Sequence, residues 1–204
     1  MPMTSRKETI RDHFENLSDH RDRWISRNRA YYDDDRHYMQ FVVPAGARVL
    51  EIGCGTGDLL ARLRPSYGVG VDLSGRMVET AQNKYPDLDF VEGDAEADDF
   101  VLGLEGPFDY IVLSDTIGYL DDIERVLRSL NKICEPHTRL VVAYYSHLWE
   151  PVLGMAEWFD QKMPQPDVNF LSSSDITNLL YLAGFEIVRT DWRQLIPRLS
   201  LIHI

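Results

Sequence analysis

Val49-Leu-Glu-Ile-Gly-Cys-Gly-Thr-Gly57 is the stretch that decides the fold of this chain. A short apolar run ends in alternating glycines, and Leu59 to Leu63 then resumes an apolar pattern that indicates a helix. The glycines at 53, 55 and 57 let the backbone turn tightly and let a ligand approach without Cβ clashes. Because a strand, a glycine loop and a helix in this order place free helix amides at a ligand site, the stretch predicts one unit of an open α/β sheet.

Outward from this loop, strand and helix patterns alternate along the chain. Strands are predicted at 48–53, 68–73, 88–91, 108–113, 139–145 and 185–191, with a last, antiparallel one at 199–204; helices are predicted at 59–63, 75–84, 121–133 and from a cap at Ser174 or Asp175 to Ala183. Ser74 is the predicted N-cap of the helix at 75–84. The alternation predicts an α/β fold, a doubly wound and mostly parallel sheet with helices on both faces.

An N-terminal segment precedes the alternating body. Residues 6–41 carry apolar and aromatic side chains among many charges, at Phe14, Leu17, Trp24, Ile25, Tyr31, Tyr32, Tyr38 and Phe41. This pattern predicts an amphipathic helical cover, made of two helices. We therefore expect a cover or lid over 1–43 and an α/β body over 44–204, within one globular domain. Arginines at 21, 23, 27 and 29 form either a solvated face or a lid in which Arg27, Tyr31 or Tyr32 touches the ligand.

Charge and composition limit the partners of the chain. The 204 residues carry a net charge of −12, which argues against nucleic acid and against an anionic membrane surface. No apolar run approaches the ~20 residues that span a bilayer, and no secretory signal is visible. The two cysteines and six histidines show neither a disulfide pattern nor metal-ligand spacing. We expect a cytoplasmic protein without a metal site.

Two carboxylates sharpen the interpretation of the glycine loop. Asp72 ends the second predicted strand, roughly 20 residues further on, where a carboxylate would bind ribose hydroxyls. The spacing is GxGxG, and Asp58 stands where a dinucleotide-binding loop has its third glycine. Glu51 precedes the first glycine by two residues. It would repel a pyrophosphate and suits a ligand with positive charge, such as an α-ammonium or a sulfonium.

With these motifs the chain resembles the class I methyltransferases, a Rossmann-like family that binds S-adenosylmethionine (SAM). The matching motifs are Glu51–Gly57, Asp72 within Val71–Ser74, Glu92–Glu96 for adenine, and Phe108–Thr116 on the strand nearest the methyl donor, within a match from about Tyr31 to Asp191. The resemblance implies SAM as cofactor and S-adenosylhomocysteine (SAH) as its product.

The resemblance also implies roles for individual residues. Gly53, the Cys54 backbone and Gly55 would lie under the methionine half, and Asp72 would hold the ribose. The full set of expected cofactor-binding residues is Tyr32, Glu51, Gly53, Cys54, Gly55, Asp72, Leu73, Met77, Asp94, Ala95 and Ser114. Leu73 and Met77 would flank the adenine, and Asp94 would accept from its amino group. Met77 as a core residue and Asp94 as a turn residue remain alternatives.

The methyl acceptor is expected beyond the carboxyl ends of the fourth and fifth strands. Candidate acceptor contacts are Asp115, Thr116, Tyr119, Tyr145, His147 and Trp149. His147 is the first candidate for a general base because its unperturbed pKa lies near neutrality, and Asp115 is the second. Packing or capping by His147, with transfer by proximity alone, is the alternative.

The predicted function is methyl transfer to a small-molecule or glycan- or lipid-linked acceptor, at oxygen. The stretches 145–151 and 162–166 are similar to bacterial methyltransferase domains joined to a glycosyltransferase, which suggests a downstream domain or partner of that kind. The Asn/Asp-Pro-Pro-Tyr motif of DNA amino-methylating enzymes does not follow the fourth strand. A non-catalytic SAM-binding regulatory module and a nucleotide-dependent oxidoreductase are the alternatives. The sequence does not predict the oligomeric state.

Overall fold

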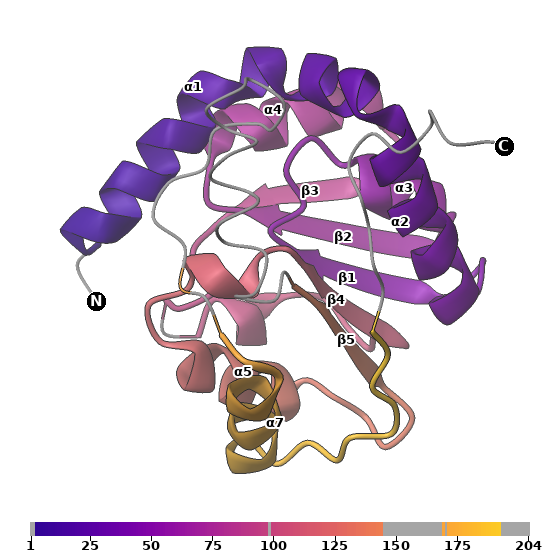
Figure 1. Cartoon of the computed structure of the whole chain (residues 1–204), viewed down its shortest axis with the longest axis vertical. Helices are drawn as coiled ribbons and strands as arrows, with labels where there is room; N and C mark the ends of the chain where they lie inside the picture. Colours follow the sequence, from indigo (N-terminus) through magenta and orange to yellow (C-terminus); the bar gives the residue numbers. More distant parts are fainter. Residues whose placement is uncertain (1–2, 98, 145–168, 170, 193–204) are drawn as a thin grey trace, which may run out of the picture.

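The computed structural model describes residues 3–97, 99–144, 169 and 171–192. Within them the chain forms one parallel sheet in the order β3-β2-β1-β4-β5 (Figure 1). The strands are β1 (Arg48–Ile52), β2 (Tyr67–Asp72), β3 (Asp89–Glu92), β4 (Tyr110–Ser114) and β5 (Arg139–Ala143). The order reverses between β1 and β4, which makes their carboxyl ends the ligand edge of the sheet.

Helices cover both faces of this sheet, as a doubly wound fold requires. They are α1 (Ser5–Arg27), α2 (Arg29–Val42), α3 (Asp58–Leu63), α4 (Gly75–Lys84), α5 (Ile123–Lys132) and α7 (Ser173–Leu182). Side chains of α2, α3 and α4 pack on one face, and those of α5 and α7 pack on the other. The predicted α/β class is confirmed.

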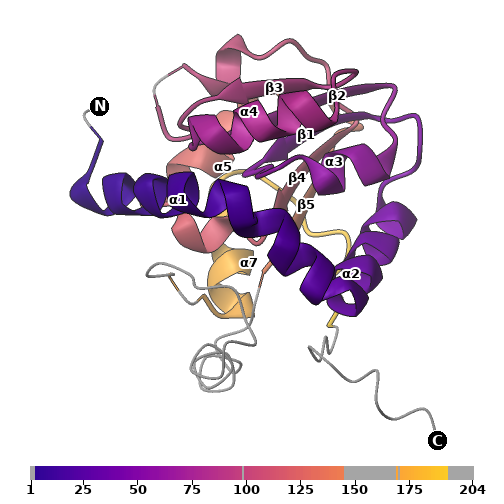
Figure 2. The same cartoon turned by 90° about the horizontal axis from the view of Figure 1, so that it is seen from above.

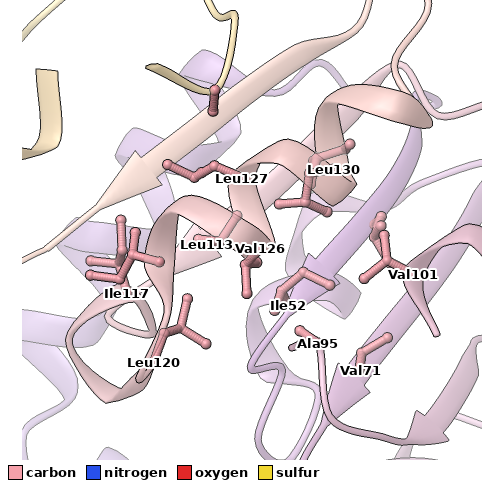
Figure 3. Packing of buried hydrophobic residues seen from close by; sticks show 14 of the residues in the cluster. Ile52, Val71, Ala95, Val101, Leu113, Ile117, Leu120, Val126, Leu127 and Leu130 are labelled. Atoms are coloured by element: carbon pink, nitrogen blue, oxygen red, sulfur yellow. The ribbon is translucent and has the colours of Figure 1, made fainter. Parts of the chain in front are cut away.

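The larger core lies between the sheet and α5. Val126, Leu127 and Leu130 are fully buried, because the apolar positions of α5 recur at helical spacing and face the strands. Figure 3 shows them gathered with strand residues such as Ile52 and Leu113. Burial of each such side chain stabilises the fold by roughly 1.5–3 kcal/mol. This core holds the ends of β1 and β4 in place.

The N-terminal segment forms two helices, as predicted. Thr4 caps α1 by accepting from the Lys7 amide at 3.2 Å, and α1 then continues without interruption to Arg27. Phe14, Leu17 and Trp24 of this helix pack in a small cluster with Met77 of α4. Figure 2 shows α1 lying across the ends of the strands, against α4 and α2.

The prediction of a sixth strand at 185–191 is wrong for the described residues. Gly184 ends α7 in the left-handed region, as expected, but no ladder with β5 follows. Instead Asp191 accepts from the Tyr38 hydroxyl on α2 and pairs with Arg189 at 2.8 Å. Val188 is 75% exposed, so the apolar pattern of this segment is not matched by burial. The predicted strand at 199–204 lies outside the described residues.

The cap of α7 also differs from the prediction. Ser172 is the N-cap, and its hydroxyl accepts from the Asp175 amide at 3.2 Å. The Asp175 carboxylate accepts in return from the Ser172 amide at 2.9 Å, which completes a capping box. Ser174 and Asp175 therefore lie in the first turn of α7, and neither is its cap. Adjacent serines made the choice ambiguous in the sequence.

This assignment predicts different effects for two neighbouring serines. Ser172→Ala removes the acceptor for the Asp175 amide, so we expect it to lower the free energy of unfolding by about 1 kcal/mol. Ser174→Ala removes an exposed hydroxyl that lies 2.7 Å from the Ser172 hydroxyl, and is expected to cost less than about 0.5 kcal/mol. Urea unfolding followed by circular dichroism measures both. A larger loss for Ser174→Ala would refute the assigned cap.

Candidate active site

The glycine loop after β1 forms the floor of the site. Gly53, Gly55 and Gly57 all have positive φ, at 77°, 53° and 79°. A Cβ at Gly53 would lie 2.1 Å from Thr116 Oγ1, so only glycine fits between β1 and the end of β4. The amides of Gly53 and Cys54 both donate to one carbonyl of β2, at 2.7 and 3.0 Å. These bonds set the shape of the loop before any ligand is bound.

Asp72 connects this loop to α4. Its Oδ2 accepts from the Gly55 amide at 2.7 Å, and its Oδ1 accepts from the Ser74 amide at 3.0 Å. Burial raises the pKa of Asp72, and the two backbone hydrogen bonds oppose that rise. Ser74 is the predicted N-cap of α4 and accepts from the Met77 amide at 3.2 Å. Asp72 is therefore held in one orientation, with further lone pairs on both oxygens for a ligand.

Glu51 lies beneath the loop and is only 3% exposed. Its Oε2 has no hydrogen-bond partner among the described residues. Burial raises the pKa of Glu51 to about 8, although the nearby Arg21 charge opposes the rise. A buried carboxylate without a full set of partners costs free energy in the empty protein. The arrangement suits a cationic group placed over the loop.

Arg21 on α1 lies at this site although the sequence did not single it out. The Cζ of its guanidinium lies 2.7 Å from where a Gly55 Cβ would be. The sequence favoured Arg27 as the lid contact, but Arg27 is exposed and lies over the Trp24 ring at 5.3 Å. Arg21 follows Phe14 by seven residues and therefore shares its helix face, a signal that was present in the sequence.

Lys7 reaches the predicted adenine motif from the first turn of α1. Its Nζ lies 2.6 Å from Asp94 Oδ2 and 2.8 Å from Glu96 Oε2. Burial lowers the pKa of Lys7, but the two carboxylates outweigh this effect and raise it. Asp94 Oδ1 accepts from the Glu96 amide at 2.9 Å, and the Asp94 carbonyl accepts from Ala97 in a turn. Asp94 therefore lies in a turn, and its carboxylate also has a cationic partner; its role towards adenine stays a prediction.

Three further adenine candidates are Met77 on α4, Leu73 just before that helix, and Ala95 after β3. Met77 is fully buried and packs with Leu17 under α1, so the core interpretation holds for it. Leu73 is half-buried, and Ala95 is buried beside Asp94. A role of these residues in holding adenine stays a prediction.

The end of β4 forms the side of the site opposite Asp72. The Thr116 hydroxyl donates to the Ser114 carbonyl at 3.0 Å. Asp115 has a φ of 54° and is fixed by its amide, which donates to Ala143 of β5 at 2.9 Å. A non-glycine residue in this region costs of order 1–3 kcal/mol, and such strain often occurs at active sites.

Tyr32 approaches the same region from α2. Burial raises the pKa of its phenol, Arg21 opposes the rise, and Asp115 adds to it. The Arg36 guanidinium lies over the Tyr32 ring at 5.6 Å. His147, Tyr145 and Trp149 fall outside the described residues.

Polar contacts made by residues within 6–22 tie α1 to the ligand edge of the sheet. In chain order they join Arg6 to the carbonyls of Gly118 and Tyr119, Lys7 to Asp94, Glu15 to the Ser74 hydroxyl, and Asp22 to the Thr56 hydroxyl. The partners follow the strands β4, β3, β2 and β1. The segments that follow four strands therefore all contact α1, which lies over the ligand edge of the sheet.

The methyltransferase domain family matches residues 24–190 of the chain. This chain belongs to that family. The demethylmenaquinone methyltransferase of Staphylococcus saprophyticus is 27% identical over 215 residues, covering 91% of each protein. An O-methyltransferase of Penicillium expansum is 30% identical over 162 residues, which are 73% of this chain and 56% of that protein.

Solved structures agree with this assignment. A SAM-dependent methyltransferase of Thermotoga maritima, described as a possible histamine N-methyltransferase, has a TM-score of 0.69 and 26% identity, covering 87% of this chain and 82% of that one. The magnesium protoporphyrin IX methyltransferase of Synechocystis, solved with bound SAH, has a TM-score of 0.71, covering 91% and 92%. At 21% identity this second likeness shows the fold.

The methyltransferase is thus a SAM-dependent enzyme with a Rossmann-like fold, as the sequence motifs indicated. Because the chain belongs to this family, the alternative of a nucleotide-dependent oxidoreductase is rejected. No helix in the described part of the chain is both long and apolar enough to cross a membrane.

Proposed function

We propose that this enzyme transfers the SAM methyl group to an oxygen atom of a small-molecule, glycan or lipid-linked acceptor at the ends of β4 and β5. The observation that carries the proposal is the contact between the glycine loop and the end of β4. Thr116 Oγ1 fills the space where a Gly53 Cβ would be, so a ligand on the loop directly adjoins Ser114 and Asp115. A methyl group and its acceptor could therefore meet there.

The described residues fit SAM as a ligand at the carboxyl ends of the strands. The positive-φ glycines form a floor without Cβ atoms, and the unpartnered Oε2 of Glu51 suits the α-ammonium. Asp72 retains lone pairs for two ribose hydroxyls. In this proposal the adenine lies between Leu73, Met77 and the Asp94–Ala95 turn, with Ser114 near the methionine half. Bound SAM supplies an electrophilic methyl group.

Positioning accounts for most of the catalysis that such a transfer needs. Displacement at a sulfonium methyl group requires an aligned nucleophile, and a base only if that nucleophile must lose a proton. Asp115 is the base candidate within the described residues, because its strained backbone fixes a carboxylate beside Tyr32. His147, the first candidate from the sequence, lies outside the described residues and stays a candidate. In this proposal the helices within residues 1–43 act as a cover that excludes water from the bound ligand.

The acceptor class follows from charge and from the relatives. A net charge of −12 disfavours a polyanionic acceptor such as nucleic acid. Relatives include a demethylmenaquinone methyltransferase and an O-methyltransferase by name, which support acceptors that are small or lipid-linked. A C-methyltransferase of quinone biosynthesis also matches, and it makes a carbon acceptor the rival. A glycosyltransferase partner remains a hypothesis.

An acceptor screen tests the proposal. SAH formation is measured with phenols, sugars, demethylated quinols and DNA oligonucleotides, with Asp72→Ala as the inactive control. We expect turnover with hydroxyl acceptors and a methyl ether as product, identified by NMR. A carbon-methylated quinol as the only product would refute oxygen as the acceptor atom. SAM binding without turnover on any acceptor would instead favour a regulatory module. Asp115→Asn and His147→Gln then separate the two base candidates.

A further inference from the structure

Lys7 is a buried lysine in the first turn of α1. Its side chain is only 10% exposed, and its Nζ lies 2.6 Å from Asp94 Oδ2 and 2.8 Å from Glu96 Oε2. Both carboxylates belong to the segment after β3, far from Lys7 in the sequence. Because an ammonium is costly to bury unless anions pair with it closely, the three side chains form one cluster. Two negative groups share one positive group in it.

Asp94 is held through both of its oxygens. Its Oδ2 faces the Lys7 ammonium, and its Oδ1 accepts from the Glu96 amide at 2.9 Å. A carboxylate has about four lone-pair sites, so Asp94 can still accept from a ligand. Its side chain is 24% exposed, which leaves a ligand a way to reach it. Asp94 therefore offers an acceptor of fixed orientation.

The turn that carries Lys7 is fixed independently of Asp94. Arg6, the preceding residue, donates to two successive carbonyls after β4, both at 3.1 Å, and pairs with Asp121 at 2.5 Å. Thr4 donates to the same carboxylate at 2.6 Å. Lys7 is thus delivered to Asp94 by an anchored helix end, and it loses little freedom by pairing there.

The group that Asp94 suits is a purine with an amino substituent. Adenine carries an amino group that donates hydrogen bonds, whereas guanine carries a carbonyl oxygen at the same ring position, which a carboxylate repels. We propose that Lys7 is a positioning residue, which holds the Asp94 carboxylate in the orientation that accepts from the adenine amino group of the cofactor. This inference rests on the proposed placement of adenine at the Asp94–Ala95 turn.

Removal of the ammonium would affect Asp94 in two ways. Its Oδ2 would lose its fixed partner, and the Asp94 and Glu96 carboxylates would repel each other without a cation between them. The Asp94 side chain would then turn away from the position that suits the amino group. The first turn of α1 thereby sets the preference of the enzyme for adenine.

The test compares SAH with its 6-desamino analogue, in which purine replaces adenine and only the amino group is missing. Calorimetry measures binding of both ligands to the full chain and to Lys7→Met, Arg6→Met and Asp94→Ala. The readout is the ratio of the two dissociation constants. Arg6→Met is the matched control, because it removes a neighbouring tie of α1 and leaves the Lys7–Asp94 pair in place. A purely structural role of Lys7 would change both affinities together and leave the ratio unchanged.

In the wild type SAH should bind about 10–100-fold more tightly than the analogue, because a hydrogen bond to a charged group is worth that much. Lys7→Met should lower this ratio at least about fivefold and leave the analogue within about threefold of its wild-type affinity. Arg6→Met should keep the wild-type ratio.

A double variant carries the test if Lys7→Met alone does not fold, since that change leaves two carboxylates without a cation. Lys7→Met combined with Glu96→Gln keeps the net charge of the cluster, because one positive and one negative group are removed together. Compared with Glu96→Gln alone, the double variant should show the same fall in the ratio.

The outcomes separate the role of Lys7 from the placement of the cofactor. If Asp94→Ala lowers the ratio but Lys7→Met leaves it unchanged, or weakens both ligands equally, the role of Lys7 is refuted and the placement of adenine stands. Equal binding of both ligands to the wild type, or an unchanged ratio in Asp94→Ala, would overturn that placement and the inference with it. Absence of SAH binding to the folded wild type would overturn the proposed function itself.

Discussion

Asp72→Ala is expected to weaken binding of SAM and SAH by at least about 100-fold. In the proposed complex its carboxylate accepts from the ribose hydroxyls, and each hydrogen bond to a charged group contributes roughly 1.5–3 kcal/mol. Two such bonds correspond to a factor of about 10²–10⁴ in Kd. The Gly55 and Ser74 amides also lose their acceptor, so the empty loop is less ordered in the variant.

Calorimetry with SAM, SAH and NADH measures this effect. Asp109→Ala is the matched control, because the Asp109 carboxylate also accepts from a backbone amide, that of Arg48 at 2.8 Å, where β1 begins. That control should keep wild-type affinity. Wild-type binding of NADH, or Asp72→Ala binding SAH within threefold of wild type, would contradict the assigned role.

Glu51→Gln is expected to have opposite effects on the empty and the bound protein. The pKa of Glu51 is raised from 4.5 to about 8 in the folded chain. The folded state therefore binds the Glu51 proton more tightly than the unfolded state does. The stability that this group contributes is fully present below pH 4.5 and is lost as the pH rises towards 8. At pH 8 the variant should be more stable than wild type by about 2–4 kcal/mol.

The same substitution should weaken SAM binding by about 100-fold, because the α-ammonium loses its charged partner. In the wild type, affinity should rise between pH 6 and 7.5 as Glu51 gives up its proton, and this slope should vanish in Glu51→Gln. Urea unfolding and calorimetry across this pH range measure both effects, with the exposed Glu79→Gln as control. A variant that is less stable than wild type at pH 8, or that keeps the slope, would refute this account.

Local signals in the sequence were sufficient to predict the strands and helices that carry the site. The alternation of strands and helices, the Ser74 cap and the position of Asp72 each depend on residues close together in the chain, and the structure agrees with them. The contacts of Lys7 and Arg21 could not be predicted in the same way. The helical period shows which residues share a face of α1, but it does not show which strand end that face meets.

The two wrong predictions, the cap of α7 and the sixth strand, also concern features that depend on how separate segments meet. Ser172 caps α7 and not Ser174, because the choice between near neighbours depends on where the chain leaves the preceding turn. The residues after Gly184 have an apolar alternation but no neighbouring strand to pair with among the described residues. A strand is a property of two segments, so a pattern in one segment alone predicts it less reliably than it predicts a helix.

The way α1 is attached has a consequence for how the fold opens. It is joined to the rest of the chain by ion pairs and hydrogen bonds, with separations such as 112, 87 and 59 residues, and by a small apolar cluster. Such an element behaves as a separate foldon, whose release costs less free energy than global unfolding. Amides of α1 should therefore exchange with deuterium through a low-energy opening that leaves β1 and β4 protected. The central strands would stay paired during this partial opening.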